Sequence, residues 1–488
     1  MSTRKIAAST FWQLGSQAAM AVLSIITSKF IAVGLSKELA GHYNSAYGYL
    51  QIFGILADFG LYAVAVREVS KAADKVKTLG VLLVLRSIIL VLSLGAAILF
   101  VWIIPVWRGT PFPVGVTIAA LVPFFTLLAG MIRTVYQVEY KMHFVFIAEV
   151  LQRVLTTACI GVFVFWGVRS TTDVSVYEAF LWIGGAGAFV LFLVSVLYAD
   201  HLIALRPTFD RALMKKIFLL AAPYGIAYLC MAFYRQLDVV FITLLRPDFA
   251  IQNAYYGFAG RMEDMAFLVP TFLLNSVLPI LSDRSEKKQP VEQLLGKTIL
   301  ILLYSGSIFL LFSLLWSRQL TLLLTTHAYL STPGQPGSDT AFQLLSVPML
   351  LNGIVLYSFY ILLTRHAWKR LAVSLALGAL LSAVLNYLLV PPYGFVGAAS
   401  ALIAVHVFLS IILLPQAQKV LPARVSAMQM LQWIAFSVVL AGALWVLLPF
   451  TTSIPRTIGG LVVVAACIAA MVWVLGIHRT LLRSAQSD

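Results

Sequence analysis

The chain has 488 residues, of which 61% are hydrophobic and 11% are charged. Soluble globular proteins have about 25% charged residues, so this composition excludes a soluble enzyme and indicates a protein that crosses a membrane several times. The net charge of +15 would suit a nucleic-acid-binding protein, but the basic residues lie mainly in short gaps between apolar stretches. We therefore expect no nucleic-acid partner.

A helix needs about 20 apolar residues to cross a bilayer. About fourteen stretches of that kind follow one another along the chain, at residues 8–33, 42–66, 78–104, 114–138, 144–168, 176–199, 214–245, 253–281, 294–317, 341–364, 370–390, 395–416, 427–449 and 456–477. The sequence therefore predicts an all-α polytopic membrane protein with about 14 transmembrane helices.

Lys and Arg concentrate in the gaps that follow even-numbered spans, such as residues 67–77 and 284–288. Loops rich in Lys and Arg stay on the cytoplasmic side of a membrane, so we expect both termini in the cytoplasm and anionic membrane lipids beside these loops. Cys159, Cys230 and Cys467 all lie inside spans and predict neither a disulfide nor a metal site.

An internal repeat is indicated by a shift of 212 residues, which aligns Tyr43 with Tyr255 and Gly48 with Gly260, each at the start of an even-numbered span. Basic loops follow at equivalent places, and each half then contains six spans. The repeat predicts two six-helix bundles related by a pseudo-two-fold axis, with a site between them. The expected division is residues 1–205, residues 206–420, and two additional helices with a cytoplasmic tail in residues 421–488.

Eleven charged residues lie in the interior of the spans, at least four residues from either end. The basic ones are Lys29, Arg86, Arg133, Arg153, Arg235 and Arg261, and the acidic ones are Asp58, Glu149, Asp238, Glu263 and Asp264. An Arg or Lys at the centre of a membrane helix costs about 2.5 to 3.5 kcal/mol even on lenient scales, so such residues normally face protein or water. The six basic residues are candidate ligands for an anionic substrate, and the five acids are candidates for ion coupling or charge pairing.

Spacing suggests partners for several of these residues. Glu149 and Arg153 are four apart on one helical face, and the pairs Arg235 with Asp238 and Arg261 with Asp264 are three apart on spans seven and eight. Each pair has two open interpretations, a salt bridge that packs helices together or a charged lining of an aqueous path.

The remaining charges are also open to two interpretations. Arg86, Arg133 and Arg153 lie near the cytoplasmic ends of their spans, where long side chains can reach lipid head groups. Lys29 lies near the outer end of span one, where the same applies. Asp58 has no basic residue within a helical turn, so it is either a coupling-ion site or a helix-packing residue.

The sequence lacks the common motifs of catalysis and of resident cofactors. It contains no Gly-rich phosphate loop, no Cys-x-x-Cys, no His-Glu-x-x-His and no Gly-x-Ser-x-Gly. We therefore predict neither catalytic residues, nor a metal site, nor a cofactor, and any transport must use an ion gradient, the membrane potential or the substrate's own gradient.

Two segments resemble the polysaccharide transporter, or oligosaccharide flippase, family. In residues 55–71 the matching residues are Asp58, Phe59, Gly60, Leu61, Arg67, Glu68 and Ser70, and in residues 386–405 they are Asn386, Leu389, Pro392, Tyr393, Gly394, Gly397, Ala398 and Ala399. The family's superfamily also contains multidrug antiporters and peptidoglycan-precursor flippases. The resemblance implies two six-helix bundles around a cationic cavity and a bacterial or archaeal plasma membrane as the location.

The resemblance also implies a substrate, an oligosaccharide linked by a diphosphate to a polyprenyl lipid, which is moved from the cytoplasmic to the outer leaflet during cell-surface polysaccharide synthesis, such as that of O-antigen. Arg binds diphosphate oxygens in a bidentate manner. Arg86, Arg133 and Arg153 would receive the diphosphate first, and Arg235 and Arg261 would hold it later. A glycan polymerase or ligase is then a possible partner.

Two alternatives stay open. A multidrug or organic-cation antiporter of the same superfamily would need surplus acids, whereas the interior of the spans holds six basic residues and five acidic ones. A membrane glycosyl polymerase or ligase would also bind polyprenyl diphosphates through arginines, but it usually needs a larger external loop than this chain offers.

Overall fold

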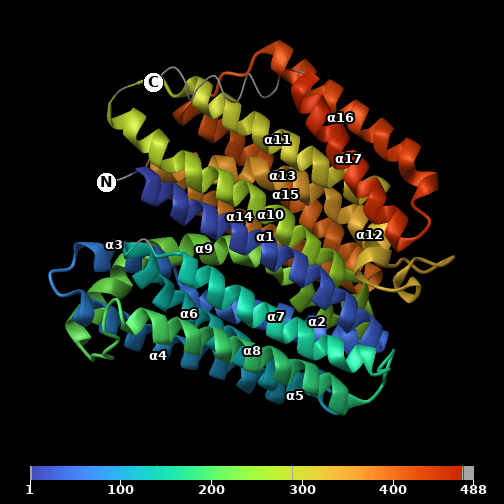
Figure 1. The fold of residues 1–488 in the computed structure, drawn as a ribbon, viewed down its shortest axis with the longest axis horizontal. Coiled ribbons are helices and arrows are strands. Elements are labelled where there is room, and N and C mark those ends of the chain that lie inside the picture. Colours follow the sequence, from blue (N-terminus) through green and yellow to red (C-terminus); the bar gives the residue numbers. More distant parts are fainter. Residues whose placement is uncertain (1–2, 140, 288, 366, 475, 477–488) are drawn as a thin grey trace. The chain divides into compact units, whose positions relative to one another are not determined.

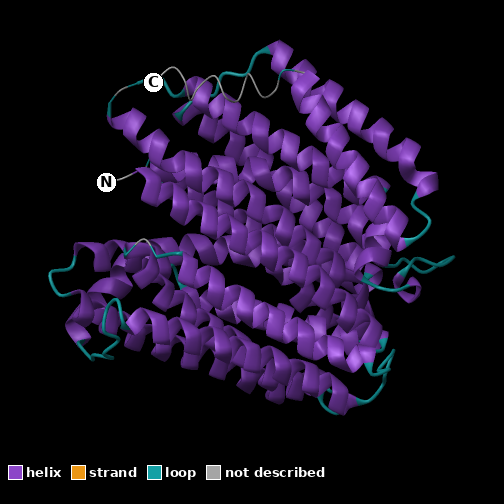
Figure 2. Cartoon of the chain, viewed as in Figure 1, coloured by secondary structure: helices purple, strands orange, loops and turns teal. Residues whose placement is uncertain are grey.

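The computed structural model describes residues 3–139, 141–287, 289–365, 367–474 and 476, and these are almost entirely helical (Figures 1 and 2). Contacts divide the chain into two compact units, Met1–Gly257 and Phe258–Asp488, called unit 1 and unit 2 below. Only isolated bridges, and no β-strand, occur within those described ranges. The predicted all-α polytopic fold is confirmed.

Unit 1 contains nine α-helices and the start of a tenth within its described residues. They are α1 (Thr3–Gly34), α2 (Lys37–Asp58), α3 (Leu61–Lys71), α4 (Lys75–Ile103), α5 (Phe112–Ala119), α6 (Leu121–Val138), α7 (His143–Phe165), α8 (Val174–Asp200), α9 (Arg211–Leu245) and the first part of α10 (Phe249–Glu286). Helix α1 packs against α7, α6 and α7 pack against α8, and α2 packs against α9, α4 and α5.

Unit 2 contains the rest of α10 and seven further α-helices in the portion that the structure describes. They are α11 (Glu292–Leu315), α12 (Ser317–Leu324), α13 (Ser338–Thr364), α14 (Trp368–Tyr393), α15 (Phe395–Val420), α16 (Ala427–Leu447) and α17 (Ile454–Val474). Helix α13 packs between α11 and α15, α14 packs on α15, and α16 joins α11 to α17. Short 3-10 turns occupy Pro105–Trp107, His327–Tyr329 and Leu448–Phe450.

The predicted spans agree closely with these helices. Eleven coincide with helices that are long and apolar enough to cross a membrane, counted over the described residues alone. The other three, at residues 8–33, 42–66 and 253–281, coincide with α1, with α2 and α3 together, and with α10. The three-part division that follows from the internal repeat stays a prediction. The two units are defined by contacts between helices, and α9 belongs to unit 1 because it packs against α2, α3 and α4.

Span two differs from its expected form because it is broken in the middle. Phe59 and Gly60 both adopt left-handed backbone angles, with φ of 39° and 68°, so α2 ends at Asp58 and α3 begins at Leu61. A left-handed residue cannot continue a right-handed helix, and Gly is the residue that tolerates this angle best. The sequence pattern alone predicts one continuous span here.

Several helices of unit 1 begin at a side chain that caps the first turn. Ser36 accepts a hydrogen bond from the Leu39 N–H at the start of α2, and Asp74, Asp173 and Asp210 do the same for α4, α8 and α9. Such caps satisfy backbone donors that the first turn leaves open. They fix where each span emerges from its apolar stretch.

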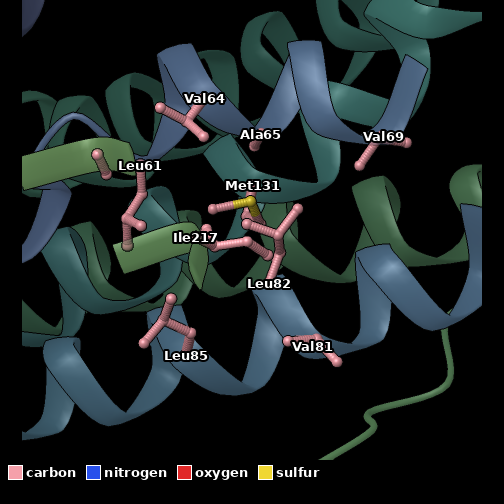
Figure 3. Close-up of a cluster of buried hydrophobic side chains, with 10 residues drawn as sticks. Leu61, Val64, Ala65, Val69, Val81, Leu82, Leu85, Met131 and Ile217 are labelled. Carbon is pink, nitrogen blue, oxygen red and sulfur yellow. The ribbon is translucent and has the colours of Figure 1, made fainter. Parts of the chain in front are cut away.

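The core of unit 1 near the break is a compact apolar cluster (Figure 3). Its members come from α3, α4, α6 and α9, and they are Leu61, Val64, Ala65, Val69, Val81, Leu82, Leu85, Met131, Ile217 and Ala221. A second cluster, in unit 2, holds α16 and α17 against α11 and α12, with Trp316, Phe436, Leu440, Leu444, Val464 and Met471 at its centre. Burial of apolar surface therefore fixes both the short α3 and the two C-terminal helices.

Candidate functional site

Two ion pairs between helices of unit 1 form the core of the candidate site. The first joins Arg86 on α4 to Asp58 at the end of α2, with 2.5 Å between Nη1 and Oδ1. The same Nη1 also donates to the main-chain carbonyl of Asp58 at 3.1 Å. The Arg86 side chain is 2% exposed, whereas that of Asp58 is 37% exposed, so the carboxylate is the accessible member of this pair.

The second pair joins Arg133 on α6 to Glu149 on α7, with 3.1 Å between Nη1 and Oε1. Glu149 also accepts a hydrogen bond from the Ser16 hydroxyl on α1. The two charged side chains are 22% and 15% exposed. The Nε of Arg133 is buried and finds no hydrogen-bond partner among the described residues, so this guanidinium retains a donor for another acceptor.

Tyr62 on α3 lies near members of both pairs. Its hydroxyl donates to Oε1 of Gln137 on α6 at 2.6 Å, and it is within electrostatic range of Arg133, Asp58 and Glu149. The arrangement brings together side chains from six helices. We call it the unit 1 charge cluster, and its members are Ser16, Asp58, Tyr62, Arg86, Arg133, Gln137 and Glu149.

Their position inside apolar spans identified the four charged members of this cluster, but the sequence did not reveal their partners. Asp58 has no basic neighbour on its own helix, yet Arg86 reaches it from α4. Glu149 contacts Arg133 from another helix, while Arg153 lies half-buried one turn further along α7. The carboxylate of Asp58 is thus paired across helices, and its role as a coupling-ion site or as a helix-packing residue stays a prediction.

Ser16, Tyr62 and Gln137 were missed at the sequence level. A signal was available for Gln137, which is four residues after Arg133 on α6. Polar residues at this spacing share one face of a helix. Tyr62 is four residues after Asp58, but the break places these two residues on different helices. Ser16 has no such charged neighbour in sequence, and only the packing of α1 on α7 reveals its role.

The other predicted residues of unit 1 lie outside this cluster. Lys29 is half-buried in the last part of α1. Arg235 is half-buried on α9, one turn before Asp238, which is 5% exposed. Asp238 accepts hydrogen bonds from the Tyr256 hydroxyl and from the Val239 N–H. The role of these residues in substrate binding stays a prediction.

Three predicted residues belong to unit 2, all on α10. The guanidinium carbon of Arg261 lies 5.6 Å from the centre of the Phe258 ring, a cation–π contact. Glu263 is buried and Asp264 is half-buried. The expected pairing of spans seven and eight through these charges stays a prediction, as does a substrate path that uses them.

The chemistry of the unit 1 charge cluster is that of exchangeable pairs. Burying an ion costs several kcal/mol, which its partner offsets when geometry is good. An incoming anion that binds a guanidinium therefore competes with the resident carboxylate, and the displaced carboxylate can then take up a proton or cation. Such an arrangement is typical of membrane proteins that move charged groups.

Solved structures share this fold at low sequence identity. The lipid II flippase MurJ in an inward closed conformation matches with a TM-score of 0.68 and 14% identity, over 96% of this chain and 99% of that one. An inward-facing multidrug resistance MATE family transporter of the MOP superfamily matches with a TM-score of 0.60 and 12% identity, over 82% and 94%. The MATE multidrug transporter DinF-BH, solved in complex with a ligand, gives a TM-score of 0.58 and 14% identity, over 86% and 97%.

These matches, with charges held inside apolar helices, define a multi-pass membrane protein with the fold of the MOP superfamily. No curated protein matches the chain in sequence. The sequence profile described as polysaccharide biosynthesis protein matches residues 6–285, more than half of the chain, and the protein belongs to that family. The family resemblance is thereby confirmed, and the matched range includes the first of the two segments that suggested it, residues 55–71. The second, residues 386–405, lies outside that range.

Proposed function

We propose that the protein is a flippase that moves a polyprenyl-diphosphate-linked oligosaccharide from the cytoplasmic to the outer leaflet, for cell-surface polysaccharide synthesis. Membership of the polysaccharide biosynthesis family supports the substrate class. The lipid II flippase with the same fold supports the type of transport, by analogy of fold. The proposed location is a bacterial or archaeal plasma membrane with both termini in the cytoplasm, and a glycan polymerase or ligase is a proposed partner.

The observation that carries this proposal is the incomplete hydrogen bonding of the Arg133 guanidinium. Its Nη1 holds Glu149, while its Nε has no hydrogen-bond partner among the described residues. A diphosphate presents several oxygens that a planar guanidinium can bind in pairs. Arg133 therefore has a second donor for a phosphate oxygen besides the one that holds Glu149, and helix movement during transport would expose this Nε.

The transport path extends the proposal beyond unit 1. Arg133, Arg153 and Arg86 would bind the diphosphate from the cytoplasmic side, and the lipid tail would stay in the bilayer. Arg235 and Arg261 would hold the diphosphate later, with Asp238 and Asp264 assisting its release. Alternation between inward and outward openings would complete transfer, as in transporters built from two bundles.

A translocation assay in proteoliposomes tests the proposal. Glycolipid placed in one leaflet becomes accessible to a membrane-impermeant glycan-oxidising reagent only after transfer. We expect Arg133→Met to lower the initial rate about tenfold or more, because a hydrogen bond to a charged group contributes about 1.5 to 3 kcal/mol. Arg67→Met is the matched control, since Arg67 is exposed on α3, and it should transport at the parent rate.

Arg235 and Arg261, which we call the outer station because they would hold the diphosphate later, need variants of their own. Arg235→Ala and Arg261→Ala should each slow transfer while leaving expression unchanged. Full activity of both would remove the outer station from the proposal. No transfer by the parent protein, with a donor lipid of the native glycan, would overturn the flippase assignment.

An organic-cation antiporter is the second candidate. The unit 1 charge cluster holds two carboxylates for two guanidiniums, so its charge does not by itself select an anion, and the multidrug transporter DinF-BH shares the fold. Uptake of a fluorescent organic cation into the same proteoliposomes, driven by a pH gradient, discriminates the two. Under our proposal no such uptake occurs.

A further inference from the structure

The break in span two has an unusual set of contacts on its inner side. A helix that stops inside an apolar span leaves main-chain carbonyls open, which costs several kcal/mol each where water is absent. At this break the Arg86 guanidinium supplies the missing donor, because its Nη1 binds both the carbonyl and the carboxylate of Asp58. The negative end of α2 and the Asp58 charge are thus neutralised by one side chain.

Helix α9 holds the other side of the break. The ring of Phe59 stacks on Phe218, with centroids 5.3 Å apart and planes 11° apart. Gly225 allows this approach, since a Cβ there would lie 2.8 Å from both the carbonyl oxygen and the ring of Phe59. The break is therefore held by Arg86 on α4 from one side and by Phe218 and Gly225 on α9 from the other.

Beyond the break, α3 is a short helix with one apolar face. Leu61, Val64 and Val69 are buried in the cluster of Figure 3, against residues of α4, α6 and α9. On its other side, Arg67 and Lys71 are exposed. Helix α3 has only 11 residues, and it is held by its apolar face and by the contacts at the break. Hinges in proteins consist of a few residues at the end of an element, and Phe59 and Gly60 are in that position.

We propose that α3 is a hinged segment that turns about Phe59 and Gly60, and that Arg86 is the latch that holds it closed through Asp58. The trigger for opening rests on the proposed function: it is the diphosphate of the substrate. The diphosphate oxygens compete with the Asp58 carboxylate and carbonyl for the Arg86 guanidinium. Tyr62 lies on α3 and Asp58 lies at its hinge. Opening therefore moves these two residues away from the pair of Arg133 and Glu149. Arg86 is then a positioning residue that acts through Asp58 before it contacts substrate.

Cysteine labelling in lipid nanodiscs tests the latch without reference to transport. Cys159, Cys230 and Cys467 are replaced by Ala, and Val69→Cys, at a fully buried position of α3, reports opening by its rate of reaction with a membrane-permeant maleimide. Arg86→Met should raise that rate at least tenfold. Asp58→Asn should raise it less, because the main-chain carbonyl still binds Arg86.

Two controls separate hinge opening from general loosening. Arg133→Met breaks the other ion pair and should leave the labelling of the Val69→Cys reporter within twofold of the parent. A Val116→Cys reporter on α5, also fully buried, should be unaffected by Arg86→Met. The latch is wrong if Arg86→Met leaves the Val69→Cys reporter within twofold, or if it raises labelling of both reporters equally.

Addition of a polyprenyl diphosphate to the protein with Arg86 intact tests the trigger. The rate at the Val69→Cys reporter should rise toward that of Arg86→Met. If the same preparation translocates glycolipid while labelling stays unchanged, the trigger is wrong and the flippase assignment stands. If it translocates nothing but Arg86→Met opens α3, the flippase assignment fails and the latch itself is supported.

Discussion

The Arg133 and Glu149 pair shows how a charge can be kept inside an apolar helix. Both side chains are largely buried, and desolvation costs several kcal/mol for each ion. Mutual attraction and the hydrogen bond from Ser16 offset that cost. Such a pair adds little net stability, but loss of one partner leaves the other charge buried and uncompensated.

Removal of one partner should therefore be worse than removal of both. We expect Arg133→Met to lower the free energy of unfolding by about 3 kcal/mol, and the double variant Arg133→Met with Glu149→Gln to recover most of that loss. Glu149→Gln keeps an acceptor for Ser16. Thermal unfolding in detergent, compared between single and double variants, measures the effect, and equal losses in both would assign the cost to packing instead of charge.

The residues of the candidate site illustrate what local sequence can identify. Charges inside apolar stretches are visible at once, because their cost is set by the helix that carries them. Their partners are not visible, since Arg86 meets Asp58 and Arg133 meets Glu149 only after helices pack. Tyr62 is a neutral member, and nothing in its local composition separates it from other tyrosines at membrane depth.

At the scale of elements, the two units show the same close approach between a helix and a loop. In unit 1, a Cβ on Gly80 near the start of α4 would lie 2.0 Å from the Arg206 carbonyl oxygen, in the loop after α8. In unit 2, a Cβ on Gly296 near the start of α11 would lie 2.0 Å from the Arg424 carbonyl oxygen, in the loop after α15. Under the predicted repeat these are spans three and six, and spans nine and twelve, so the likeness supports that repeat.

Both glycines should be intolerant of a methyl group. We expect Gly80→Ala and Gly296→Ala each to lower the free energy of unfolding by about 1 to 3 kcal/mol, the usual cost of overpacking, because the loop backbone must move. Gly95→Ala on α4 is the matched control, since its Cβ would meet no atom within 4 Å. Thermal midpoints in one detergent compare the three, and an unaffected Gly296→Ala would remove this support for the repeat.

A salt bridge outside the spans joins α4 to α9. Lys77 Nζ lies 2.8 Å from Asp210 Oδ2, while Asp210 Oδ1 caps α9 by accepting from the Leu213 N–H. The hydrogen bonds from Lys77 and from the Leu213 N–H lower the pKa of Asp210. The hydrogen bond and charge of Asp210 in turn raise the pKa of Lys77.

The pH range of this contribution follows from those directions. A carboxyl with a lowered pKa stabilises the fold above its unfolded pKa of about 3.9, and that contribution is lost as the pH falls through the lower folded value. Lys77 contributes below its unfolded pKa of about 10.4, with loss as the pH rises above that value. The pair is therefore fully formed between about pH 5 and pH 9.

Asp210→Asn isolates the charge, because Asn also caps helices well. We expect this variant to unfold at a lower temperature than the parent at pH 7, and the difference to shrink steadily as the pH falls below about 3.9, because the lowered pKa of the folded carboxyl delays its protonation to more acidic pH. Lys77→Met should cause a similar loss at pH 7, and the double variant should lose little more. A difference that persists unchanged at pH 3 would contradict a charge-based origin.

For the whole molecule, the pattern of spans was the most predictable property. Each predicted span coincides with a helix or with two helices in series, because hydrocarbon imposes both the length and the apolar composition of what crosses it. The break at Phe59 and Gly60 was not predicted, since its stability depends on Arg86 and Gly225 from helices distant in sequence. Helix formation could be predicted from the sequence, whereas the packing between helices could not.

The proposed direction of transport depends on which ends of the helices face the cytoplasm, and unit 1 offers two exposed reporters for this. Ala73 lies in the basic gap between α3 and α4, and Thr172 lies between α7 and α8. Because basic gaps stay cytoplasmic, Thr172→Cys in whole cells should react with a membrane-impermeant maleimide, and Ala73→Cys should react only after permeabilisation. Both reporters require a background without Cys159, Cys230 and Cys467. The reverse pattern would place the unit 1 charge cluster near the outer leaflet and would contradict uptake of the diphosphate from the cytoplasmic side.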